Sequence, residues 1–79
     1  MPMSIKVRYF ASLRERIGRS EDSINAAQSM TVKDVWQAAN RDVTLPDNVL
    51  AAINMDYAAL DDKVRDGDEV AFFPPVTGG

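Results

Sequence analysis

An apolar stretch that runs into two prolines constrains the fold of this chain more than any other feature. Within residues 69–73, apolar side chains alternate with others, so that Val70 and Phe72 point to one face of a predicted strand. Pro74 and Pro75 follow directly, and neither has an amide hydrogen to donate to a neighbouring strand. We therefore expect the last strand to end at this point, with an extended tail beyond it.

The length of the chain limits the size of its core. With 79 residues it forms one domain, and the absence of cysteine means that no disulfide supports the fold. A hydrophobic content of 46% is nevertheless typical of a folded protein. We expect a single domain spanning residues 1–79, of which residues 74–79 are the tail.

The composition disfavours several classes of function. A chain without cysteine or histidine lacks thiol nucleophiles, histidine bases and the ligands of most zinc sites. The acidic residues within 66–69 do not have the spacing of a calcium-binding loop, and Asp61-Asp62 is typical of a solvated turn. We therefore expect no metal site and no acid–base centre in this chain.

The charge and hydropathy of the sequence disfavour nucleic acid and membranes as binding partners. The net charge of −3 makes nucleic acid a poor candidate. No apolar run approaches the length of about 20 residues that crosses a bilayer, and residues 1–6 lack the apolar core of a signal peptide. We expect a cytoplasmic protein that binds neither nucleic acid nor a membrane.

The first half of the chain predicts a strand, a short helix and a second strand. Residues 5–10 alternate apolar and basic side chains, as in a strand with one buried face. Ser12 and Glu15 have the spacing of a capping box for a helix of about two turns, and Gly18 suits its C-terminal end. Residues 23–27 form a weaker strand pattern.

The second half predicts the main helix and the rest of a sheet. Thr31 is the expected N-cap of a helix whose apolar stripe consists of Val32, Val35, Trp36 and Ala39. Residues 49–54 and a stretch around Tyr57 are predicted strands, and Asp66-Gly67 is a hairpin signal before the last strand. The pattern indicates an α+β fold with the main helix packed across one face of a sheet, and Trp36 in the core.

Two phenylalanines interrupt the alternation. Phe10 and Phe73 each fall on the face of their strand that otherwise carries charged residues. Either a shift in strand register or a covering loop accounts for them, or they form an exposed apolar patch that binds another protein. The residues alone leave both interpretations open.

The tail has the features of a reactive chain end. Residues 74–79 span about 20 Å at most when extended, and Gly78 and Gly79 have no side chains to block entry into a narrow channel. A carboxylate is a poor electrophile, but transfer of its acyl group to AMP creates a mixed anhydride that a sulfur nucleophile can attack. The product would be a C-terminal thiocarboxylate, which carries sulfur without a cysteine. The competing interpretation is a frayed end without chemistry.

These features closely resemble the small subunit of molybdopterin synthase, a sulfur carrier subunit of the ubiquitin-like family. The resemblance covers nearly the whole chain, and its most specific part is the C-terminal motif. The matching stretches are Ile5-Lys6-Val7-Arg8-Tyr9-Phe10-Ala11, Leu13-Arg14-Glu15, Thr31-Val32, Ala51-Ala52-Ile53-Asn54, Leu60 and residues 66–79.

The resemblance implies a ubiquitin-like β-grasp fold with a mixed sheet and a flexible C-terminal Gly-Gly tail. It also implies that Gly79, preceded by Gly78, is adenylated by an enzyme related to ubiquitin-activating enzymes. A sulfur donor acting through that enzyme would then convert Gly79 to a thiocarboxylate. The chain would hold no cofactor stably, and ATP would be consumed by the activating enzyme.

The same resemblance implies a complex with the large subunit of molybdopterin synthase, which would supply the catalytic side chains. Sulfur would pass from each small subunit to cyclic pyranopterin monophosphate, so this chain would not be an enzyme by itself. The tail residues inserted into the large subunit would be Pro74, Pro75, Val76 and Thr77. An apolar patch used against both partners would consist of Phe10, Tyr57 and Phe73.

Alternative functions stay open at this stage. Sulfur carriers of the thiamine pathway and of tRNA thiolation share the fold and the Gly-Gly end, although residues 72–77 favour molybdopterin. A ubiquitin-like binding module whose tail does no chemistry belongs to a different class, as does an independent enzyme, for which the sequence contains no catalytic constellation. Formation of a thiocarboxylate at Gly79 would separate the carriers from the binding module.

Overall fold

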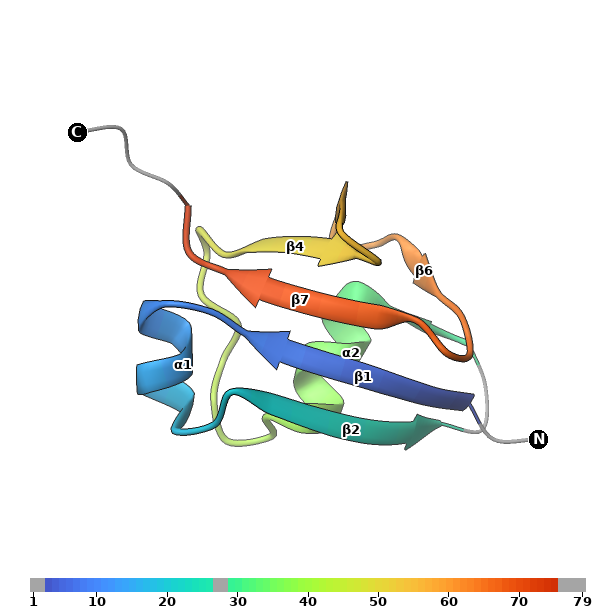
Figure 1. Ribbon diagram of the computed structural model, residues 1–79, viewed down its shortest axis with the longest axis horizontal. Coiled ribbons are helices and arrows are strands. Elements are labelled where there is room, and N and C mark those ends of the chain that lie inside the picture. The colour runs from blue at the N-terminus through green and yellow to red at the C-terminus, as the bar shows by residue number, and fades with distance from the viewer. Residues whose placement is uncertain (1–2, 27–28, 76–79) are drawn as a thin grey trace.

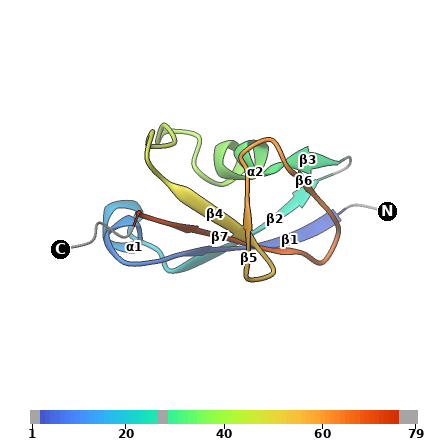
Figure 2. The same ribbon diagram turned by 90° about the horizontal axis from the view of Figure 1, so that it is seen from above.

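The structure is a computed structural model that describes residues 3–26 and 29–75. A five-stranded sheet forms one layer, and the main helix α2 packs across one of its faces (Figure 1 and Figure 2). The predicted α+β architecture is thus confirmed. In chain order, the elements are β1 (Met3–Tyr9), α1 (Ser12–Ile17), β2 (Glu21–Ala26), β3 (Met30–Thr31), α2 (Val32–Ala39), β4 (Leu50–Ile53), β5 (Asp56–Ala58), β6 (Lys63–Val64) and β7 (Glu69–Phe73).

The first and last strands of the chain lie side by side in the middle of the sheet. Its strand order is β2-β1-β7-β4-β5, and the central pair β1–β7 is parallel, whereas the other pairs are antiparallel. The register places Tyr9 beside Phe72 and Arg8 beside Ala71. β3 and β6 form a separate two-stranded sheet. The sheet is therefore mixed, and the strand that precedes the tail is paired on both sides.

The core lies between the inner face of the sheet and α2. Ile5, Val7 and Tyr9 of β1 are buried, as their alternation predicted, and so are Val70 and Phe72 of β7. From α2, the buried side chains are those of Val32, Val35 and Trp36.

Three aromatic rings dominate the centre of this core. The centroid of the Trp36 ring lies 5.0 Å from that of Phe72 and 5.9 Å from that of Tyr9, both in edge-to-face geometry. The Tyr9 and Phe72 rings stack across the parallel strand pair at 6.3 Å. Such aromatic pairs stabilise the folded state by more than the burial of their surface area alone. The prediction that Trp36 belongs to the core is confirmed.

The start of α2 agrees with its sequence signals. The Thr31 side chain accepts a hydrogen bond from the Asp34 amide, and the Asp34 carboxylate accepts one from the Thr31 amide. This reciprocal pair satisfies two amide groups that the helix itself leaves unpaired. The hydrogen bond from the Thr31 backbone lowers the pKa of the Asp34 carboxyl.

The capping of α1 differs from its prediction. Its N-cap is Ala11, at φ 55° and ψ −131°, and no side chain caps the helix, so the predicted Ser12–Glu15 capping box is wrong. The chain instead turns tightly after β1, with the Leu13 amide donating to the Phe10 carbonyl at 3.2 Å. This turn makes Ser12 the first helical residue. The predicted C-terminal end is confirmed, because Gly18 adopts φ 84°.

The strand pairing also differs from its prediction. Asp66-Gly67 forms a turn, but the strands on either side do not pair with each other, so the predicted hairpin is wrong. β6 pairs with β3, and β7 pairs with β1 and β4. The Asp66 carboxylate instead accepts a hydrogen bond from the Ser4 amide at 2.7 Å, and the Gly67 amide donates to the Ser4 carbonyl. The turn is therefore held by the first strand.

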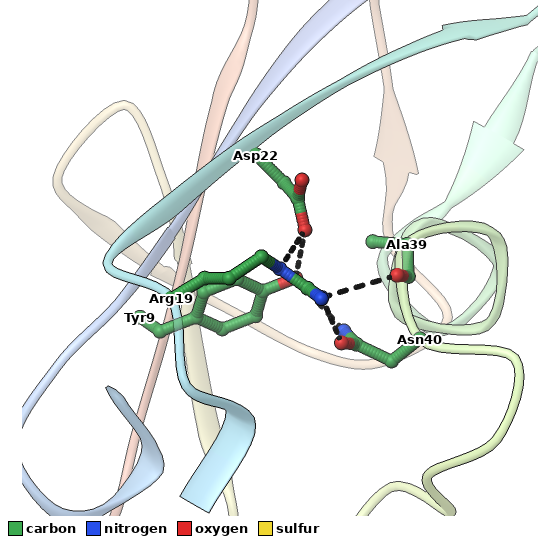
Figure 3. A network of polar contacts seen from close by, with 5 residues as sticks. All are labelled: Tyr9, Arg19, Asp22, Ala39 and Asn40. Carbon is green, nitrogen blue, oxygen red and sulfur yellow. Dashed lines mark hydrogen bonds and ion pairs between the residues drawn. The ribbon is translucent and has the colours of Figure 1, made fainter. Parts of the chain in front are cut away.

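A polar network closes one end of the core (Figure 3). Asn40, only 5% exposed, donates to the Tyr9 hydroxyl at 2.8 Å, and its carbonyl oxygen accepts from Arg19 at 2.6 Å. Arg19 also forms an ion pair with Asp22 at 2.8 Å, and the Tyr9 hydroxyl donates to the same carboxylate at 3.3 Å. The network joins the end of α2 to β1 and β2.

We predict that this network makes stability sensitive to alkaline pH. Burial raises the pKa of the Tyr9 phenol above its ordinary value of about 10. The folded state therefore holds this proton more tightly than the unfolded state does. The resulting stabilisation is complete below pH ~10 and is lost as the pH rises through the folded-state pKa.

Thermal melts across this pH range test the prediction. Tyr9→Phe should lower stability at pH 8 by about 1 kcal/mol through the lost hydrogen bonds, and its melting temperature should then fall less steeply above pH 10 than that of the wild type. Tyr57→Phe, at an exposed tyrosine, is the matched control and should follow the wild-type profile. Parallel losses of stability in the wild type and Tyr9→Phe would contradict the prediction.

Candidate functional site

The outer face of the sheet carries a shallow apolar hollow of about 370 Å³. The three residues expected to form a binding patch, Phe10, Tyr57 and Phe73, all line it. We call this hollow and its lining residues the docking face. Its other lining residues are Arg8, Ala52, Met55, Glu69 and Ala71.

The sheet register explains why a hollow forms at this place. Ala52 of β4 lies opposite both Ala71 of β7 and Tyr57 of β5. The two alanines have little side-chain volume, so they leave a low floor between larger neighbours. Aromatic side chains rise around this floor from β5 and from the ends of β1 and β7. Small residues in the middle and aromatic residues at the rim together produce the concave shape.

The rim residues are exposed or partly exposed. Tyr57 is 80% exposed and Phe10 is 42% exposed, whereas Phe73 is partly buried. The Phe73 ring packs against Tyr57 with 5.9 Å between centroids, and the Arg8 guanidinium lies 5.5 Å from the centre of the Phe10 ring. No register shift hides the two phenylalanines, so their predicted position on the outer face is confirmed. A cluster of exposed aromatic residues of this kind is typical of a protein-binding surface.

The docking face is continuous with the root of the tail. β7 ends at Phe73, and Pro74 and Pro75 follow without regular secondary structure, both partly buried. Pro74 lines a second hollow together with Leu13 and Arg16 of α1. The predicted end of the strand is thus confirmed. The other tail residues with expected roles, Val76, Thr77, Gly78 and Gly79, lie outside the described residues.

The charged groups near the docking face offer no catalytic arrangement. Among the residues that the structure describes, the charged ones that line it are Arg8 and Glu69. Across residues 3–26 and 29–75, no group of three or more histidine, cysteine, aspartate or glutamate side chains is placed to hold a metal ion. The described side chains of the docking face therefore do not form a reaction centre.

Comparison with known proteins places the chain in a family. A family model described as the ThiS family matches residues 7–79. The chain belongs to the ThiS family. It is 46% identical to the molybdopterin synthase sulfur carrier subunit of Escherichia coli, over 95% of this chain and 99% of that protein. It is 38% identical to the subunit of the same name from Haemophilus influenzae, again over 95% and 99%.

Solved structures agree on the fold of this ThiS-family chain. The crystal structure of SAMP1 from Haloferax volcanii superposes with a TM-score of 0.80 at 31% identity, covering 96% of this chain and 99% of that one. The ubiquitin-like β-grasp that the sequence resemblance implied is therefore confirmed. Within the described part of the chain, neither helix has the length and apolar character needed to span a membrane.

Five lining residues of the docking face were missed by sequence analysis. Ala52 and Ala71 could have been found, because each lies in the middle of a recognisable strand and has a small side chain. Arg8 and Glu69 were interpreted only as the solvated side of their strands. Met55 lies between two predicted strands, and nothing local indicates that this position borders the hollow. Their grouping depends on strand order, which the sequence does not specify locally.

Proposed function

We propose that this chain is the sulfur carrier subunit of a molybdopterin synthase. One observation carries the proposal: a sulfur carrier subunit matches 95% of the chain. The family model matches residues 7–79, a range that includes the lining of the docking face and the Gly-Gly end. In this role the reactive group is the carboxylate of Gly79. The folded domain binds the partner protein and thereby directs this carboxylate into the partner's active site.

Two chemical steps would load the tail with sulfur. The Gly79 carboxylate attacks the α-phosphate of ATP in an adenylating enzyme, which forms an acyl adenylate and releases pyrophosphate. A sulfur nucleophile delivered by a donor through that enzyme then attacks the acyl carbon, and AMP leaves. The chain ends as a thiocarboxylate and holds no cofactor of its own. Both steps would take place in the cytoplasm.

The tail would then enter the large subunit of the synthase. From Phe73, residues 74–79 reach about 20 Å at most, so the active site of the partner must lie within that distance of the docking face. Pro74 and Pro75 stiffen the first part of this path. The side chains of Val76 and Thr77 would contact the walls of the channel that leads to the partner's active site. Gly78 and Gly79, which have no side chains, would fit the narrowest part of that channel.

Inside the large subunit, the thiocarboxylate would donate its sulfur to cyclic pyranopterin monophosphate. This chain has no cysteine or histidine, so it acts as a donor and the large subunit supplies the catalytic groups. The thiamine and tRNA pathways remain as alternative destinations for the sulfur. The names of the relatives favour the molybdopterin pathway.

Intact-mass measurement tests the loading step. The chain is co-expressed with its activating enzyme and a sulfur source, then purified and weighed by mass spectrometry. We expect a species in which one oxygen atom is replaced by sulfur, and fragmentation should place the change at Gly79. A variant that lacks Gly79 should stay unmodified. A wild-type chain that never carries the extra sulfur would contradict the carrier function.

Replacement of Phe73 tests the docking face. Phe73→Ala should raise the Kd for the large subunit by about tenfold, equivalent to about 1.4 kcal/mol, because an aromatic anchor of the docking face is lost. Its effect on folding should be small, since the side chain is only partly buried. Calorimetric titration and thermal melting measure the two quantities separately.

The preceding residue supplies the matched control. Phe72 is fully buried, so Phe72→Ala should destabilise the fold by about 3–5 kcal/mol. A large fall in the melting temperature of Phe73→Ala with unchanged partner affinity would show that Phe73 serves the core instead of the docking face.

A further inference from the structure

The turn between β4 and β5 holds a methionine in a conformation that its side chain disfavours. Asn54 and Met55 have φ angles of 51° and 74°, in the left-handed region. Asparagine tolerates this region, but methionine pays a steric cost that glycine would avoid. Met55 is also 91% exposed. The two-residue loop between the paired strands β4 and β5 requires positive φ at both positions, so folding explains the backbone conformation but not the choice of a large apolar residue.

Hydrogen bonds fix this turn to the neighbouring strand. The Asn54 amide donates to the Glu69 carbonyl at 2.8 Å, and the Glu69 amide donates to the Asn54 side-chain oxygen at 3.0 Å. The Asn54 side-chain nitrogen donates to the Asp68 carboxylate at 2.9 Å. The backbone and the side chain of Asn54 thus both hold the turn against the start of β7. Met55 is thus presented from a fixed backbone.

The position of the turn brings Met55 to the docking face. Met55 lines the same hollow as Phe10, Tyr57 and Phe73. Figure 2 shows the turn after β4 extending to the side of the sheet opposite α2. Met55 is therefore a large exposed apolar side chain that the fold does not require and that borders a face with aromatic anchors.

We propose that Met55 is a further anchor for the large subunit, and that Asn54 is the residue that positions it. This inference rests on the proposed function. A partner that receives the tail must cover the face containing Phe73, because Pro74 follows directly, and Met55 borders that same face. An unbranched thioether side chain adapts its shape to a partner surface. The strained turn keeps this flexible side chain at the rim.

Substitutions at position 55 separate binding from folding. Met55→Gly removes the side chain and also relieves the backbone strain, so its melting temperature should equal or exceed that of the wild type. Its Kd for the purified large subunit, measured by calorimetric titration, should rise by about fivefold or more. Met55→Leu keeps a large apolar side chain in the same turn and should stay within about twofold of the wild type. Met55→Asn, which suits the turn but is polar, should bind as weakly as Met55→Gly.

Two further variants complete the test. Asn54→Gly tolerates the left-handed conformation but loses the side-chain bonds to Asp68 and Glu69, so it should weaken binding while Met55 is still present. Leu60→Ala is a matched control at a half-exposed leucine that does not line the docking face, and its Kd should not change.

The outcomes distinguish this inference from the proposed function. If the wild type binds the large subunit and Met55→Gly binds equally well, or if Met55→Gly melts at a lower temperature, Met55 is not an anchor and the sulfur carrier function stands. If the wild type does not bind the large subunit at all, the docking proposal and this inference both fail.

Discussion

The parallel pairing of β1 with β7 is the contact on which the other features of this protein depend. It brings the first and last strands together at the centre of the sheet, with Tyr9 beside Phe72. Because side chains alternate along a strand, this pair places Tyr9 and Phe72 on the inner face and their successors, Phe10 and Phe73, at the outer face. A shift of one residue would exchange the two sets and remove both the core and the docking face.

The same strands thus serve stability and function at once. On the inner face, Tyr9 and Phe72 pack with Trp36 in an aromatic core, and the Tyr9 hydroxyl joins the polar network of Asn40 and Arg19. On the outer face, the aromatic rim surrounds a floor of small side chains. β7 is paired on both sides, so the root of the tail starts from a firmly held strand. In the proposed function, this firm attachment would help the domain direct its chain end into the partner.

Local patterns in the sequence predicted the parts of the fold that depend on local physics. Alternation around Val7 and Val70 identified the central strands, and Thr31 with the apolar stripe that follows it identified the start of α2. Two errors arose where distant contacts decide the outcome. The chain turns at Ala11 as it leaves β1, and Asp66-Gly67 is bound by β1 instead of joining a hairpin. The docking face was only partly predictable, because the hollow exists only once β4, β5 and β7 lie side by side.

In the proposed function, the folded domain delivers sulfur from its own chain end, and an assay with labelled sulfur tests this delivery. The chain is loaded with isotopically labelled sulfur at Gly79, then mixed with the large subunit and cyclic pyranopterin monophosphate. We expect the label to leave the carrier and to appear in the dithiolene of the pterin product, with one carrier consumed for each sulfur atom. Label that stays on Gly79 while the large subunit is bound, or product that forms without loss of label, would show that this chain is not the sulfur donor.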